Sequence, residues 1–481
     1  MLQLLNQNGI LTSAGAILTV STALLYAVIQ SIVKSTKRAP RGCRRLGLPK
    51  GQSNLYDEFD SKYSSGVPES SADEQGLPAW RVKALFTYPI KSCTGVELVE
   101  SDVVSTGFAF DRQFCFGELD ETRNWIARTL RNKGFNRLAL VRPEIWVPDL
   151  DMQGYSYDLE EVRSGGVMVV YYPRPSSSPR HGAAWNAIYS TIIKTGMYFG
   201  LIPNETSFIV PLFPSTDSKG PNTNQKSGLP LTNVKIWKDN PLAYNYGQYI
   251  PSSFHDFLSE EFPESNNSTR NKHSSASIKN RQVTLFRVNP SHPREIYRNA
   301  PRKEELGFQP TTGFADAYPI HILSLSSVRD VNARCAKDIQ HLSIRRFRAN
   351  VIVQGPAAFE EDDWKVIRIS PSTVKAKASG EEDNDGQEKE LVIHTACRTI
   401  RCKLPNVNPD TGIRHPSEPD RTLKSYRKID QGDLTNACLG MQGVPAVRES
   451  RIRVGDKISV VETGEHRYIK MLAPGEVVEG V

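Results

Sequence analysis

Residues 401–412 of this 481-residue chain read Arg-Cys-Lys-Leu-Pro-Asn-Val-Asn-Pro-Asp-Thr-Gly. A strand-like run, residues 391–396, precedes them, and a Glu-Pro pair opens residues 418–427 after them. Cys402 is therefore expected at a strand end between an arginine and a lysine, where positive charge favours the thiolate. Thiolates are metal ligands. On these residues alone, a half-buried structural cysteine beside a surface turn is the favoured interpretation, and a metal ligand is the alternative.

Length, charge and cysteine usage narrow the class of protein. A chain of 481 residues is long enough for two or three domains. The net charge of +7 suits an anionic cofactor or an anionic membrane surface, and it does not point to nucleic acid. The seven cysteines are scattered and odd in number, which is typical of a reducing compartment rather than of a secreted disulfide framework.

The N-terminus has a hydrophobic run followed by positive charge. Residues 1–33 carry no charged side chain, and a cluster of basic residues follows. The apolar part is long enough to cross a hydrocarbon core of about 30 Å, and a secretory signal would carry its positive charge before the run. We therefore predict a membrane anchor with a basic flank over residues 1–46 and a cytosolic body. A cleaved targeting segment is the alternative, and the polar residues 47–76 are predicted to be a linker.

A first domain is predicted over residues 77–300, with polar insertions near 202–230 and 264–279. Alternation over residues 80–88 predicts its first strand. Further strands are expected at residues 108–116, 124–128, 138–141 and 282–288. Residues 183–201 are expected to form a helix that packs through Trp185, Ile188, Ile192 and Phe199, followed by a disordered loop.

A second domain is predicted over residues 301–470, with an acidic insertion near 370–388 and a tail at 471–481. It is expected to open with a strand at 320–325. A helix at 328–339 would follow, with Val328, Val331 and Cys335 on one face.

Three stretches resemble the MOSC domains of the mitochondrial amidoxime-reducing component family. Its pattern of Arg-Cys, Asp-Pro-Asp-Thr-Gly and Glu-Pro followed by Tyr-Arg is similar to residues 401–427, with an asparagine at the first aspartate. Residues 88–95, Tyr-Pro-Ile-Lys-Ser-Cys-Thr-Gly, resemble the opening of its N-terminal MOSC-associated domain. Residues 347–350 resemble its Phe-Arg-Pro-Asn, with Ala349 in place of the proline, and Ile126 replaces the threonine of its Thr-Ala-Arg.

The resemblance implies a fold and a set of site residues. The fold would be α+β and mainly β: a MOSC-associated N-terminal domain, then a β-barrel-like MOSC domain, with an N-terminal transmembrane helix. Cys402 would ligate the molybdenum of a molybdopterin cofactor. Lysine binds phosphate oxygens as a point charge, and arginine binds them through its planar, bidentate guanidinium group. The cofactor-binding positions carried over are Lys91, Ser92 and Arg112 for the phosphate, together with Arg128, Asp316, Arg348, Asn350, Asp410 and Thr411.

The same resemblance implies an oxidoreductase that reduces N-hydroxylated small molecules. Its expected electron donors are cytochrome b5 and NADH-cytochrome b5 reductase, and its expected location is the mitochondrial outer membrane with the body in the cytosol. No nucleic-acid partner is expected.

Several other functions stay open from the sequence. A non-catalytic carrier of the molybdenum cofactor is one. A sulfur-transfer MOSC module is less favoured, because only about 300 residues precede the MOSC segment and they do not resemble a pyridoxal-phosphate domain. Zinc is conceivable at Cys397 and Cys402 with His394 and His415, but the spacing is not that of a zinc knuckle. Cys397 could also replace Cys402 as the molybdenum ligand.

Overall fold

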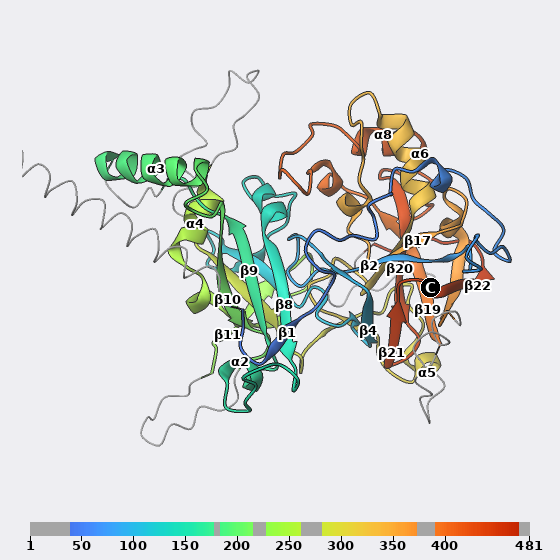
Figure 1. Cartoon of the computed structure of the whole chain (residues 1–481). Helices are drawn as coiled ribbons and strands as arrows, with labels where there is room; N and C mark the ends of the chain where they lie inside the picture. The colour runs from blue at the N-terminus through green and yellow to red at the C-terminus, as the bar shows by residue number, and fades with distance from the viewer. Residues whose placement is uncertain (1–38, 178–182, 215–227, 261–280, 373–389, 471–481) are drawn as a thin grey trace, which may run out of the picture.

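The computed structural model describes residues 39–177, 183–214, 228–260, 281–372 and 390–470. Its architecture is mainly β and contains barrels, as expected from the resemblance. In Figure 1 the green elements gather on one side of the molecule and the orange and red elements on the other.

An eight-stranded sheet forms the C-terminal half. Its first and seventh strands also pair with each other, which closes the sheet on itself. The alternation of residues 80–88 does give a strand, but β2 joins this sheet rather than a sheet of its own domain. The strands in spatial order are β17 (Val351–Gln354), β16 (Ile320–Ser324), β20 (Cys438–Pro445), β19 (Leu391–Ile400), β18 (Trp364–Ser370), β22 (Lys457–Thr463), β2 (Arg81–Thr87) and β3 (Val96–Leu98).

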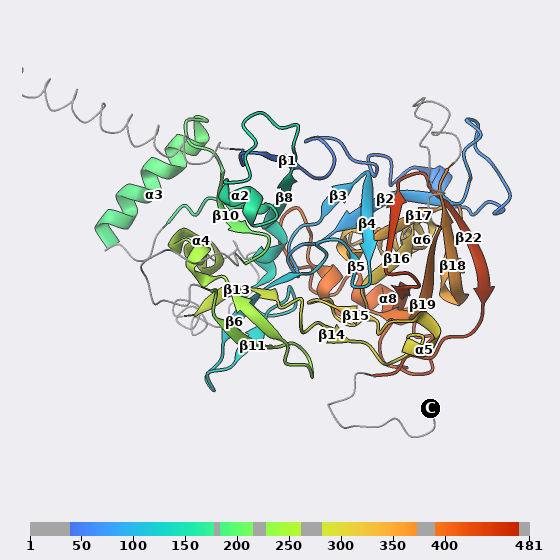
Figure 2. The same ribbon diagram turned by 90° about the horizontal axis from the view of Figure 1, so that it is seen from below.

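The other half contains a smaller closed barrel and a four-stranded sheet (Figure 2). Helix α4 (Ser252–Ser259) covers that sheet, where Phe254 and Phe257 contact the ring of Tyr172. The barrel consists of β11 (Leu231–Lys235), β12 (Leu242–Asn245), β13 (Val283–Val288), β6 (Phe114–Leu119) and β7 (Trp125–Ala127). The sheet consists of β1 (Cys43–Arg45), β8 (Arg142–Pro148), β9 (Val167–Pro173) and β10 (Glu205–Pro211).

Helices α6 (Leu325–Cys335) and α8 (Asp420–Tyr426) lie against the eight-stranded sheet. The predicted apolar face of α6 is confirmed, since Val328, Val331 and Cys335 are buried. The Tyr426 hydroxyl donates to Asp330 at 2.9 Å and ties the two helices together. The remaining elements are β4 (Glu100–Val104), β5 (Gly107–Phe108), α2 (Glu160–Arg163), α3 (Ala183–Tyr198), β14 (Arg294–Glu295), α5 (Lys303–Leu306), β15 (Thr311–Thr312) and β21 (Glu449–Arg453).

The predicted fold class included a transmembrane helix, and the structure corrects this part of the prediction. No helix in the described ranges is both long and apolar enough to cross a membrane. The longest of them, α3, has 16 residues, whereas a spanning helix needs about 20. The run 1–33, on which the prediction rested, lies outside the described residues.

Three local predictions were also wrong. Residues 138–141 lie largely in a 3-10 helix, Asn136–Leu140, rather than a strand. The segment predicted as a loop after residue 201 contains β10, which pairs with β9 along its whole length. The predicted packing face of α3 is exposed at Ile188 and Ile192, and Ile193 is the residue that is buried. The predicted insertions near 264–279 and 370–388 lie almost entirely outside the described residues.

Candidate cofactor-binding site

A cavity of about 620 Å³ is lined by residues from both halves of the chain. Cys402 lies in its wall. Seven lysines and arginines line it, against two aspartates, Asp316 and Asp433, and this excess of positive charge favours an anionic ligand. The seven are Lys91, Arg112, Arg131, Lys238, Arg298, Arg348 and Arg401.

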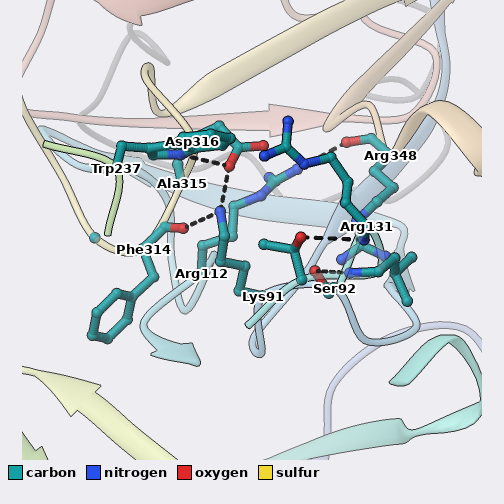
Figure 3. A network of polar contacts seen from close by, with 12 residues as sticks. Lys91, Ser92, Arg112, Arg131, Trp237, Phe314, Ala315, Asp316 and Arg348 are labelled. Atoms are coloured by element: carbon teal, nitrogen blue, oxygen red, sulfur yellow. Dashed lines mark hydrogen bonds and ion pairs between the residues drawn. The ribbon is translucent and has the colours of Figure 1, made fainter. Parts of the chain in front are cut away.

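Lys91 and Asp316 form an ion pair at one end of this cavity (Figure 3). The Lys91 backbone N–H donates to Phe114 of β6 at 2.8 Å, which fixes the loop after β2. Lys91 Nζ donates to the carbonyl of Phe314 at 3.0 Å and to Asp316 Oδ1 at 2.5 Å. The ammonium group holds the pKa of the Asp316 carboxyl well below its usual range. The Asp316 side chain is 51% exposed, so its charge faces the opening of the cavity.

Arg112 and Arg348 lie beside this pair, and both have left-handed backbone angles, with φ of +48° and +59°. Both guanidinium groups contact the ring of Tyr88, at 4.7 and 4.3 Å from its centroid. Arg112 donates to Asn350 Oδ1 at 3.0 Å and to the Arg348 carbonyl at 2.9 Å. Burial lowers the pKa of Arg348 to about 10, and an anion opposite it would offset that cost.

Arg401 and Cys402 follow the last residue of β19. Arg401 is buried, and its guanidinium donates to the Leu439 carbonyl at 2.9 Å and to His321 Nε2 at 2.5 Å. Burial and the adjacent Arg401 charge lower the pKa of His321 well below its usual value, so its ring is neutral and accepts this bond. Arg401 and Cys402 both line the cavity, so a buried cation and a thiol are neighbours in its wall.

Cys397 lies outside the cavity lining. It is 1% exposed and belongs to a buried cluster with Tyr318 and Val444. Burial raises the pKa of its thiol to about 12, which favours the protonated form. Within the described ranges, no group of three or more His, Cys, Asp or Glu side chains is arranged to hold a metal ion.

The structure brings seven of the ten predicted site residues into one cavity: Lys91, Ser92, Arg112, Asp316, Arg348, Asn350 and Cys402. The other three lie outside its lining. Asp410 makes a bidentate pair with Arg345 at 2.9 and 2.8 Å, and Thr411 is exposed in the same turn. Arg128 pairs with Glu118 at 2.6 Å beside a smaller, neighbouring cavity.

Several lining residues had no sequence prediction. His321 and Thr399 lie within strand-like runs, where a polar residue looks like part of the alternating pattern. Trp237 lies in a turn after β11, and Gln442 lies in β20. Arg401 also lines the cavity, and its position next to Cys402 was the one sign of this in the sequence.

Three buried polar atoms in the cavity wall lack hydrogen-bond partners within the described part of the chain: Arg348 Nη2, Thr399 Oγ1 and Gln442 Oε1. An unpartnered buried polar atom is costly, and most such atoms in proteins are paired. The set contains a cationic donor, a hydroxyl and an amide oxygen. A ligand with an anionic group and a polar ring edge could satisfy all three, so the residues present fit a molybdopterin.

Two domain models match the chain. The MOSC domain matches residues 309–459 and the MOSC N-terminal beta barrel domain matches residues 79–154. β2 and β3 lie within the N-terminal match, yet they pair into the sheet of the C-terminal one. The predicted domain boundaries at residues 77, 300 and 470 stay predictions.

Curated relatives are similar over part of their length. Mitochondrial amidoxime-reducing component 1 of Danio rerio is 32% identical over 153 residues, 32% of this chain and 38% of that protein. Mitochondrial amidoxime reducing component 2 of Rattus norvegicus is 37% identical over 117 residues, 24% of this chain and 28% of that protein. Mitochondrial amidoxime-reducing component 1 of Homo sapiens is 30% identical over 146 residues, which are 30% of this chain and 35% of that protein. The matched part thus spans roughly a third of these relatives. This chain contains a region that matches the MOSC domain and a region that matches the MOSC N-terminal β-barrel domain, and it resembles the mitochondrial amidoxime-reducing components.

Proposed function

We propose that this chain is an oxidoreductase that binds a molybdenum–molybdopterin cofactor and reduces N-hydroxylated small molecules. The observation that carries the proposal is the single cavity that seven cationic side chains and Cys402 line together. The similarity to proteins named amidoxime-reducing components supplies the substrate class.

Six of the lining residues have a stated role in this proposal. Lys91, Arg112 and Arg348 would bind the cofactor phosphate by charge-assisted hydrogen bonds. Cys402 would hold the metal through its sulfur atom, and the buried Arg401 precedes it in the cavity lining. When bound, the cofactor supplies two-electron chemistry at its metal. The neutral ring of His321 keeps Arg401 in place by accepting its hydrogen bond.

The donor and the location are part of the same proposal. Electrons would come from a partner protein, for which the resemblance nominates cytochrome b5 and NADH-cytochrome b5 reductase. The relatives bear mitochondrial names, and we propose a mitochondrial location for this chain. Arg128, Asp410 and Thr411 would act from outside the cavity wall, Asp410 and Thr411 by shaping the loop that follows Cys402.

The test compares two cysteine variants. We expect Cys402→Ala to lose bound molybdenum and at least 90% of benzamidoxime reduction with cytochrome b5, its reductase and NADH, because a metal ligand is missing. Cys397→Ala is the matched control: it lies on β19, which Cys402 follows, but it packs in the core, so molybdenum content and specific activity should stay near wild type. Molybdenum and pterin are measured on every sample.

Two outcomes would contradict the proposal in different ways. Full turnover by Cys402→Ala would reject the ligand assignment. Metal-loaded wild type that reduces none of several N-hydroxylated compounds would favour a cofactor carrier.

A further inference from the structure

We propose that Arg131 and Trp237 form a clasp over the phosphate-binding end of the cavity and control how fast the cofactor is released. The inference rests on the proposed function, because it takes the ligand at Lys91 and Ser92 to be the phosphate of a molybdopterin. Arg131 and Trp237 both line the cavity, and the Arg131 guanidinium stacks on the indole at 4.5 Å from the ring centroid.

Trp237 is held at the cavity opening against its local preference. Its φ is +55°, a backbone conformation that is unfavourable for a bulky residue and that collects at functional sites. The turn that carries it is anchored by Asp239, which accepts from Arg294 at 2.7 Å, and Arg294 also donates to the Ala315 carbonyl at 2.6 Å. The indole N–H then donates to Asp316 at 3.1 Å, while 43% of the side chain stays exposed (Figure 3).

Arg131 approaches from a different segment. The backbone N–H of Leu130, the preceding residue, donates to Ser92 Oγ at 3.3 Å, so Arg131 is held next to Ser92. The Arg131 side chain is exposed, and no carboxylate in the described part of the chain forms an ion pair with it. Its charge is therefore available to an anion in the cavity, whereas the charge of Lys91 is already shared with Asp316.

The clasp touches the phosphate-binding pair from two sides. Trp237 reaches Lys91 through Asp316, and the Arg131 segment reaches Ser92 through Leu130. A second cavity of about 180 Å³ lies behind the clasp, and Lys91, Arg131 and Trp237 line both cavities. The stacked pair is therefore a thin partition, and the space behind it gives the two side chains room to swing away. When closed, the two side chains would cover the anion, and Arg131 would add a fourth cation to Lys91, Arg112 and Arg348.

The test measures release of the pterin from the purified holoprotein, independently of catalysis. Protein is transferred into cofactor-free buffer, and oxidised pterin is followed by fluorescence in the filtrate over time. We expect Arg131→Ala to accelerate release about tenfold, since one charge-assisted hydrogen bond is worth about one decade. Trp237→Ala should act alike, and the double variant should be no faster than either single one, because the two side chains work as a unit.

Two further variants separate the effect of the Arg131 charge from that of its planar stack and from a general effect of removing an arginine. Arg131→Lys keeps the charge but not the planar stack, so its release rate should fall between wild type and Arg131→Ala. Arg163→Ala, an exposed arginine of α2 outside the cavity lining, is the matched control and should release pterin at the wild-type rate. The excess release rate of Arg131→Ala should shrink at high salt, because screening weakens the same contact in the wild type.

The outcomes distinguish this inference from the function on which it rests. Wild type that retains pterin while Arg131→Ala releases it at the wild-type rate would overturn the clasp alone. Wild type that never contains pterin would overturn the proposed function and the clasp together. Faster release by Arg131→Ala and Trp237→Ala, with an unchanged control, would support both.

Discussion

At the scale of single residues, two threonines of β19 differ in how their hydroxyl groups are hydrogen-bonded. The Thr399 side chain is buried, yet its hydroxyl has no partner among the described residues. Thr395, four positions earlier on the same strand, is also buried, but its hydroxyl donates to the Trp364 carbonyl and it does not line the cavity. The hydroxyl group of Thr395 thus has a hydrogen-bond partner within the protein, whereas that of Thr399 has none among the described residues.

Thr399→Val is therefore expected to stabilise the cofactor-free protein while weakening cofactor binding. Replacing a buried, unpartnered hydroxyl with a methyl group of the same shape should raise the free energy of unfolding by about 1 kcal/mol. Pterin content after purification should fall at least twofold, because the ligand loses a polar contact. Thermal unfolding and pterin fluorescence measure the two effects.

Thr395→Val is the control and should behave in the opposite way. It leaves the Trp364 carbonyl without its donor, so it should destabilise the protein by about 1 kcal/mol or more and leave pterin content unchanged. A Thr399→Val variant that is destabilised and keeps full pterin content would contradict the assignment.

At the scale of elements, the N-terminus of α6 is capped by the carboxylate of Glu361, a residue that lies outside this helix. Glu361 is fully buried; it accepts from the Ser324 backbone N–H at 3.2 Å and from the Ser327 hydroxyl at 2.8 Å. Burial, followed by the neighbouring Asp362 charge, raises the pKa of Glu361 to about 7. The buried carboxyl group that orders the helix thus also makes the protein sensitive to pH.

The sign of this dependence follows from the raised pKa. Between about pH 4.5 and 7 the folded chain keeps a proton that the unfolded chain has lost, so stability falls as pH rises through this range and stays lower above it. Glu361→Gln removes the titration. Its free energy of unfolding relative to wild type should increase by about 3 kcal/mol between pH 4 and pH 8.

Denaturant unfolding at several pH values measures this difference. Glu360→Gln, which changes the exposed neighbouring side chain, is the control. A Glu361→Gln effect of equal size at pH 5 and pH 8 would show that the carboxyl does not titrate in this range.

At the scale of the whole molecule, β2 joins the two regions that the domain models match. It pairs with β17 and with β22, and without it the eight-stranded sheet would not close. Lys91 and Ser92 follow β2 closely in the sequence, so the strand that completes the C-terminal barrel also delivers the proposed phosphate-binding residues. The cavity and the closed sheet therefore form together.

A fragment of residues 301–481 should consequently fail to fold as a soluble monomer. It would expose the unpaired edges of β17 and β22, which invite aggregation. Coexpression with residues 77–104, which supply β2, β3 and β4, should raise its soluble yield. Size-exclusion chromatography and circular dichroism measure the result, and a monomeric fragment with cooperative unfolding would contradict the prediction.

The sequence by itself determined the local features. Alternation predicted β2 and β16, apolar spacing predicted the buried face of α6, and the neighbours of Cys402 placed it at the end of β19. These features depend on a few adjacent residues, whose side-chain period and turn chemistry are visible along the chain. Prediction from local sequence was wrong at residues 138–141, which look like a strand but lie largely in a 3-10 helix.

Only the tertiary structure decided which residues share the cavity. Lys91 meets Asp316 across 225 residues, and Arg112 meets the Arg348 carbonyl across 236. Left-handed backbones at Arg112, Arg348 and Trp237 are imposed by such contacts, because their residue types do not favour them. The same contacts leave Asp410 outside the wall, paired with Arg345. No local pattern encodes these pairings, since they form only when the barrels close.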